Sequence, residues 1–141
     1  MPTAPSYSAI ATGDLLFRLI RTGTYNPAFP AGLRLVSASM QSSEYKPKPN
    51  SQGPSVFLKD LLPNRSVSDL ETENPKWKKY GIAEVPVEVI RGLGLEVNHT
   101  PDECAYATLK NAHCSITGIA DGKKRDELLR AIEPYITRIP A

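Results

Sequence analysis

Cysteine, histidine and long apolar runs are all scarce in this sequence of 141 residues. Its two cysteines, Cys104 and Cys114, could pair, but no basic segment followed by an apolar run precedes them, so a reduced pair is favoured. No segment approaches the roughly 18 consecutive apolar residues of a membrane span. We therefore expect a soluble, cytoplasmic protein that does not bind membranes.

A strong net charge is missing as well. The formal net charge is only +2, and neither half of the chain is strongly basic, which argues against nucleic acid as a partner. Neither a P-loop nor a Gly-x-Gly-x-x-Gly motif is present. A Gly-x-Ser-x-Gly elbow is also absent, and only two histidines could serve as a base, so a serine hydrolase is not favoured. No motif in the sequence specifies a reaction.

The composition that remains is that of an ordinary globular protein. The chain is 40% hydrophobic and 23% charged, as is usual for soluble domains, and its length corresponds to one domain. Residues 1–11 are small and proline-containing, which predicts a flexible lead-in to a single domain over residues 12–141. The 13 prolines are about twice the average usage, so we expect short strands and short helices.

The apolar pattern predicts an α+β fold: a small mixed or antiparallel sheet with short helices and a C-terminal helix. The predicted strands cover residues 15–20, 55–61, 81–85 and 111–118, and an apolar tail over 135–139 is expected to dock onto the sheet. The predicted helices cover a short piece from Ser66 or Ser68 to Asn74, residues 87–93 with Gly94 beyond their end, and residues 123–133.

Two local patterns give sharper expectations. Thr100, Pro101 and Glu103 match a capping box with proline at the first helical position, which predicts a helix over residues 101–109. Residues 111–118 alternate strictly, so His113 and Ser115 should share one face of a strand, opposite Cys114. A partly exposed strand histidine is the simplest interpretation of His113.

Residues 33–58 form the most conspicuous polar connection. A short apolar segment begins at Leu33, another ends at Leu58, and serines and prolines crowd the stretch between them. Long polar loops between core strands commonly carry binding or catalytic groups, because a rigid scaffold positions them. Serines in such a loop, Ser43 and Ser55 among them, more often bond their own backbone than act as nucleophiles. The sequence leaves open whether this loop is a recognition surface or only a connection.

The most suggestive chemical pair is His113 with Ser115, because residues i and i+2 of a strand point the same way. Two-histidine phosphoesterases use such a His-x-Ser/Thr strand, together with a second one that flanks the phosphate. The only other histidine, His99, lacks that spacing. The pair therefore supports a phosphoesterase or nuclease only weakly.

Arg18 is the second candidate, since it interrupts the apolar run over residues 15–20. A buried arginine must find a partner or face a cleft, because an unpaired buried charge is costly. Its planar fork could hold a phosphate or carboxylate, or it could pair with Asp14 or Glu84 on the solvent face of the sheet.

Two other groups of residues give weaker support to a function. Four possible metal ligands exist, but they lack a recognised ligand spacing: His99, Cys104, His113 and Cys114. The basic cluster at the start of the last predicted helix could attract an anion, although a solvated basic turn is the usual explanation of such a cluster: Lys123, Lys124 and Arg125.

Several short motifs, in order, resemble a pattern found in small uncharacterised bacterial proteins. They are Leu16-Phe-Arg-Leu-Ile20, Ser42-Ser43 before Tyr45, Ser55-Val-Phe57, Gly92-Leu-Gly-Leu95 and Ala112-His-Cys-Ser-Ile-Thr-Gly118. The resemblance spans most of the chain and implies a compact single domain of bacterial type. It implies no activity.

A looser similarity is to small ADP-ribosyltransferase-like domains such as the RES toxins. Those enzymes place an arginine on an early strand and serine or tyrosine hydroxyls around a nicotinamide dinucleotide. The similarity implies that Arg18, Ser43 and Tyr45 would hold NAD, with Glu44 or Glu84 nearest to the place of the required acid.

Three functions are therefore carried forward. The first is a non-enzymatic binding or accessory module of a bacterial conflict or regulatory system, with a protein partner and no cofactor. The second is an ADP-ribosyltransferase-like enzyme that uses NAD through Arg18, Ser43 and Tyr45. The third is a phosphoesterase or nuclease built on His113 and Ser115.

Overall fold

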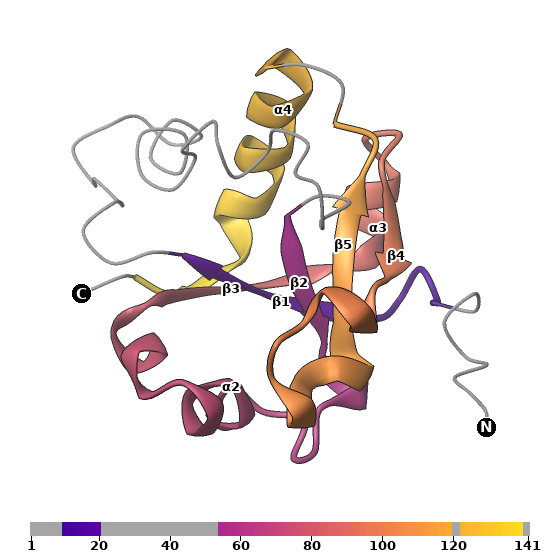
Figure 1. Cartoon of the computed structure of the whole chain (residues 1–141). Helices are drawn as coiled ribbons and strands as arrows, with labels where there is room; N and C mark the ends of the chain where they lie inside the picture. Colours follow the sequence, from indigo (N-terminus) through magenta and orange to yellow (C-terminus); the bar gives the residue numbers. More distant parts are fainter. Residues whose placement is uncertain (1–9, 21–53, 120–121, 140–141) are drawn as a thin grey trace.

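A computed structural model describes residues 10–20, 54–119 and 122–139 (Figure 1). Within these residues, six strands form one antiparallel sheet in the order β4-β5-β2-β1-β3-β6. The strands are β1 (Leu15–Ile20), β2 (Ser55–Leu58), β3 (Gly81–Pro86), β4 (Glu96–His99), β5 (His113–Thr117) and β6 (Ile136–Arg138). The predicted α+β class is confirmed, and the sheet is antiparallel.

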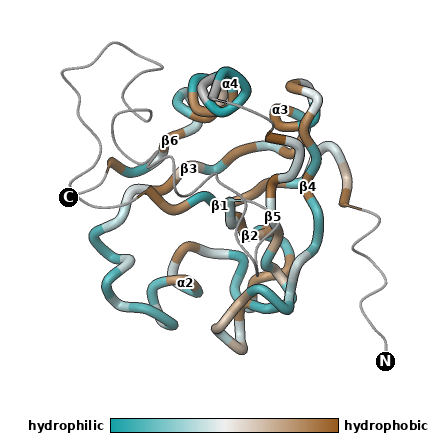
Figure 2. The backbone as a smooth tube through the Cα atoms, turned by 45° about the horizontal axis from the view of Figure 1, so that its top comes forward, coloured by the Kyte–Doolittle hydropathy of each residue, from teal (hydrophilic) through white to brown (hydrophobic). Residues whose placement is uncertain are grey.

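Short helices lie on both sides of this sheet. The α-helices are α2 (Val67–Glu73), α3 (Val87–Arg91) and α4 (Gly122–Ile132). The 3-10 helices are η3 (Lys59–Leu61), η4 (Pro75–Lys79), η5 (Pro101–Glu103), η6 (Ala107–Ala112) and η7 (Glu133–Tyr135). Figure 2 shows α3 and α4 on one side of the sheet and α2 on the other. None of the helices in the described part of the chain has the length and apolar character needed to cross a bilayer.

Because side chains alternate along a strand, each central strand contributes to two cores. Leu16 and Ile20 of β1 pack with the buried residues of α3 and α4, whereas Phe17 between them faces the opposite side. We call the second cluster the aromatic core. Its buried members are Phe17, Phe57, Leu62, Leu70, Ile82, Cys104, Leu109 and Ala112, with Trp77 and Tyr106 packed against them.

Most of the predicted elements are present. The run over residues 15–20 is β1, and the predicted strand at 55–61 is β2 followed by η3. Ser66 caps α2 through a reciprocal capping box with Asp69. Leu128, Leu129 and Ile132 of α4 are buried, as their spacing predicted, and the apolar tail adds β6 to the sheet beside β3. The helix predicted over 87–93 is shorter, because Gly92 ends α3.

One predicted helix was wrong. The stretch from Thr100 forms no single helix over 101–109 but two separate 3-10 helices, η5 and η6. The Thr100 side chain makes no capping bond, because its hydroxyl lies against His113 and Ser115 instead. A buried hydroxyl satisfied by the sheet is not available to a helix end.

Parts of the predicted domain layout lie outside the described residues. These are residues 1–9 of the lead-in and residues 21–53, which include the apolar segment that begins at Leu33. Ile10, the first described residue, is buried in the core that contains α3 and α4. Its carbonyl accepts a hydrogen bond from Arg91 Nη2 at 2.8 Å.

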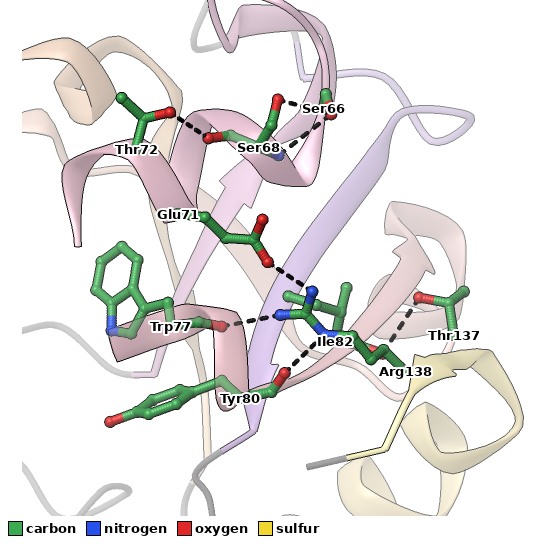
Figure 3. Close-up of polar contacts among 9 residues, drawn as sticks. All are labelled: Ser66, Ser68, Glu71, Thr72, Trp77, Tyr80, Ile82, Thr137 and Arg138. Atoms are coloured by element: carbon green, nitrogen blue, oxygen red, sulfur yellow. Dashed lines mark hydrogen bonds and ion pairs between the residues drawn. The ribbon is translucent and has the colours of Figure 1, made fainter. Parts of the chain in front are cut away.

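Arg138 of β6 fastens the C-terminal edge of the sheet to the layer that carries the aromatic core (Figure 3). Its Nε and Nη2 donate to the carbonyl oxygens of Tyr80 and Trp77, both at 2.8 Å, and Nη1 pairs with Glu71 of α2. Thr137 adds a bond to the Ile82 carbonyl at 3.3 Å. One guanidinium therefore satisfies one carbonyl within η4, one carbonyl just after it, and one carboxylate.

We predict that Arg138→Ala lowers the free energy of unfolding by about 1–2 kcal/mol, because two backbone carbonyls and Glu71 lose their donor while remaining partly solvated. Urea denaturation followed by the fluorescence of Trp77 measures the change. Arg130→Ala on the exposed side of α4 is the matched control, with an expected change within about 0.5 kcal/mol. Equal effects of the two substitutions would contradict the role of Arg138 in joining β6 to η4 and α2.

Candidate functional site

His113 lies at the start of β5 and faces the aromatic core. The side chain is only 4% exposed, so the expected partly exposed histidine is wrong. Its cross-strand partner is Phe57 of β2, whose ring meets the imidazole edge-on with the centroids 5.5 Å apart. Residues in η5, η6 and η4 cover this side of the sheet, which is why the alternating pattern of β5 did not correspond to a solvated face.

Both ring nitrogens of His113 have partners. Nδ1 lies 2.8 Å from the Thr100 carbonyl oxygen and 3.0 Å from the Thr100 hydroxyl, and Nε2 lies 3.0 Å from Ser55 Oγ. A carbonyl oxygen can only accept, so Nδ1 carries the proton. In the neutral ring Nε2 is then an acceptor, and Ser55 Oγ donates to it.

The surroundings of His113 keep the ring neutral. Burial lowers its pKa, while the backbone bond to Thr100 and the charge of Glu103 act in the opposite direction. A neutral imidazole with a free lone pair on Nε2 is a general base. His113 therefore has the protonation state and the orientation needed to accept the proton of Ser55.

Ser115 does not contact the His113 ring, which corrects the predicted pair. It is fully buried, and its hydroxyl lies 2.8 Å from Thr100 Oγ1 and donates to Glu103 Oε1 at 3.0 Å. The hydroxyl that meets His113 comes from Ser55 on the neighbouring strand, directly opposite Ser115 in the β2–β5 register. The Ser115 hydroxyl thus connects Thr100, which contacts the His113 ring, to Glu103.

Arg18 also contacts Ser55, through its backbone carbonyl. Arg18 Nη1 donates to the Ser55 carbonyl oxygen at 3.0 Å, whereas His113 contacts the Ser55 hydroxyl. The two predicted candidates, Arg18 and His113, thus contact one residue from opposite faces of the sheet. Glu84, one of the acids considered for Arg18, pairs with Lys59 at 3.2 Å. Ser55 itself is half-buried, whereas Thr100 and Ser115, the other two residues with hydroxyls around His113, are buried.

The other candidates either lie outside the described residues or make other contacts. Ser43, Tyr45 and Glu44 lie outside the described residues, as does most of the loop over residues 33–58. His99 Nε2 donates to the Asn111 carbonyl at 2.9 Å. In the basic cluster, Lys124 contacts the Leu93 carbonyl and Glu127.

Cys104 and Cys114 are both free and buried. Burial raises the pKa of both thiols, that of Cys114 to about 12, so neither is an activated nucleophile. Among the described residues, no three side chains of His, Cys, Asp or Glu are placed to bind a metal ion together.

Sequence reasoning missed three members of the group: Ser55 as the partner of His113, and Thr100 and Glu103 as its support. Ser55 was one of many loop serines, and the spacing of Thr100 and Glu103 was interpreted as a helix start. Ser55, Phe57 and His113 belong to two of the short motifs picked out in the sequence, over residues 55–57 and 112–118, and these two motifs lie side by side in the structure. Comparisons with protein-family models, with curated proteins and with solved structures found no match for this chain.

The lowered pKa of His113 predicts a loss of stability on acidification. The folded state disfavours the protonated ring, so this contribution is present above the unfolded pKa of about 6.5 and is lost as the pH falls below it. His99 shares the sign, because burial lowers its pKa too. Between pH 6.5 and 5.5, each histidine can steepen the fall in unfolding free energy by at most about 1.4 kcal/mol per pH unit.

Urea denaturation across this range separates the two histidines. In His99→Gln, where His113 is the only histidine, part of the slope should persist, and in His99→Gln/His113→Asn it should vanish. Carboxylates titrate mainly below pH 5 and contribute little in this window. A His99→Gln protein with no slope would show that His113 titrates alike in the folded and unfolded states.

Proposed function

We propose that the protein is a phosphoesterase in which Ser55 is the nucleophile and His113 is its general base. The observation that carries the proposal is the pair of contacts on opposite sides of the His113 ring. Nε2 lies 3.0 Å from Ser55 Oγ, and Nδ1 lies 2.8 Å from the Thr100 carbonyl. A nucleophile, a base and a group that orients the base are the arrangement on which covalent hydrolysis depends.

The reaction passes two protons through His113 Nε2, one from Ser55 to the leaving group and one from water back to Ser55. Ser55 Oγ attacks the phosphorus while its proton passes to His113 Nε2, and the leaving alkoxide takes that proton, which leaves phosphoserine. Water then attacks the phosphorus, His113 accepts its proton, and the P–O bond to Ser55 breaks. The proton returns from Nε2 to Ser55 Oγ, and phosphate or a phosphomonoester departs.

Arg18 supports a phosphoester over a carboxylic ester. Its Nη1 donates to the Ser55 carbonyl oxygen at 3.0 Å, but from the face of the sheet opposite Ser55 Oγ, because Arg18 lies on the side of Leu16 and Ile20. Its positive charge would therefore act on a substrate at Ser55 Oγ through the electric field and not by direct contact. An anionic phosphoester gains from that charge, whereas a neutral carboxylic ester gains much less. The expected setting is the bacterial cytoplasm, in keeping with the free thiols of Cys104 and Cys114.

The test is hydrolysis of bis(p-nitrophenyl) phosphate and p-nitrophenyl phosphate, with p-nitrophenyl acetate as the neutral comparison. We expect turnover of a phosphoester that Ser55→Ala abolishes and that His113→Asn lowers about 10²- to 10⁴-fold, the usual contribution of a general base. Ser68→Ala, at an exposed serine of α2, and His99→Gln are the matched controls and should retain full activity.

Each alternative outcome has a clear meaning. Phosphoester turnover that survives Ser55→Ala would overturn Ser55 as the nucleophile. Turnover of the acetate alone would overturn the phosphoester class. The emission of Trp77, which lies 6.4 Å from Phe57 between ring centroids, reports whether each variant retains the packing of the aromatic core.

A protein-binding module of a bacterial regulatory or conflict system is the second proposal. Its support is a separate observation: the exposed large hydrophobic residues in the described part of the chain are Tyr135 and Ile139, at 36% and 60% exposure, on either side of the edge strand β6. The NAD-utilising alternative needs Ser43 and Tyr45, which lie outside the described residues, so it stays a prediction from resemblance.

A further inference from the structure

A continuous row of hydroxyl groups joins Glu103 to the His113 ring. Ser115 Oγ donates to Glu103 Oε1 at 3.0 Å, Thr100 Oγ1 lies 2.8 Å from Ser115 Oγ, and His113 Nδ1 lies 3.0 Å from Thr100 Oγ1. The four residues come from β5, from η5 and from the position just before η5. Three of them are at least 95% buried, namely Thr100, His113 and Ser115.

The direction of every hydrogen bond in this row follows from Glu103. An ionised carboxylate can only accept, and each hydroxyl has a single proton to donate. Ser115 gives its proton to Glu103, so the Thr100 hydroxyl must donate to Ser115. The Thr100 hydroxyl then has only lone pairs left for His113, so Nδ1–H must donate to Thr100.

Two independent acceptors therefore hold the proton on Nδ1: the Thr100 carbonyl and the Thr100 hydroxyl. With Nδ1 protonated, Nε2 must present its lone pair, and Ser55 Oγ, 3.0 Å away, donates to it. Reversing the row would require a protonated Glu103 or an unpaired buried hydroxyl, which costs about 1–3 kcal/mol.

We propose that Glu103 is a positioning residue, a proposal that rests on the phosphoesterase function proposed above. Its carboxylate orients the His113 ring toward Ser55 without touching it, through the Ser115 and Thr100 hydroxyls. A carboxylate commonly contacts such a histidine directly. Here the Thr100 and Ser115 hydroxyls lie between Glu103 and His113, and the Thr100 carbonyl accepts directly from Nδ1 in place of a carboxylate.

The negative charge of Glu103 matters most when His113 has accepted the proton of Ser55. The imidazolium is then buried, and hydrogen-bonded chains polarise one another in such surroundings. Glu103 raises the pKa of His113, against the dominant effect of burial. Among the described residues, His99 of β4 also acts on the ring electrostatically, and Arg18 binds the Ser55 carbonyl from the opposite face of the sheet.

The test follows the imidazole resonance of His113 against pH in the full-length protein, together with the pH dependence of phosphoester hydrolysis. Glu103→Gln removes the charge and keeps an oxygen that can accept from Ser115. We expect it to lower the pKa of His113 by roughly 0.5–1 unit, with the acidic limb of the rate profile shifted by the same amount. Glu88→Gln, at an exposed position of α3, makes the same change of charge and should shift neither.

A second pair of variants tests the hydroxyl row itself. Thr100→Val removes the hydroxyl at constant shape, and Thr100→Ser restores it. We expect Thr100→Val to lower the pKa of His113 and to abolish the further effect of Glu103→Gln, whereas Thr100→Ser should behave like the wild type.

Unchanged pKa values of His113 in both Glu103→Gln and Thr100→Val would overturn the role of Glu103. The resonance measurement needs no turnover, so it decides this point separately from the proposed function. A wild-type protein that hydrolyses no phosphoester, but whose His113 shifts as expected, would refute the phosphoesterase and retain Glu103 as the residue that orders the buried row.

Discussion

The burial of the His113 imidazole between a carbonyl and a hydroxyl is the constraint on which this side of the structure depends. Three separate stretches must be in register before both ring nitrogens are satisfied: β5, the residue before η5, and the start of β2. An unsatisfied buried polar group costs about 1–3 kcal/mol, so a slip of any one of them is penalised. The same bonds that fix the fold here also give His113 the proton arrangement of a base.

The aromatic core explains why the imidazole stays out of solvent. Phe57 meets it edge-on, Trp77 follows Phe57, and Tyr106 packs against Trp77 at 5.1 Å between ring centroids. Arg138 and Glu71 hold the segment that carries Trp77 in place from the far edge of the sheet. The dry environment of His113 is therefore built by residues distributed over most of the described chain.

Local pattern was enough to predict the strands at residues 15–20 and 81–85 and the buried stripe of α4, because each depends on periodicity within a few residues. It failed at Thr100 and Glu103, whose spacing suits a helix start, because the buried hydroxyl of Ser115 competes for both side chains. Ser55 and His113 are 58 residues apart, and only the β2–β5 register brings them together. No local signal contains that pairing.

The central claim is that His113 is neutral with its proton on Nδ1 and its lone pair directed at Ser55. A long-range ¹H–¹⁵N correlation spectrum of the histidine-labelled protein at pH 7 tests it directly, with His99→Gln to assign the two rings. His113 should show a protonated Nδ1 and an unprotonated Nε2. His99 should show the opposite tautomer, because its Nε2 donates to the Asn111 carbonyl. A His113 ring protonated at Nε2, or at both nitrogens, would contradict the account.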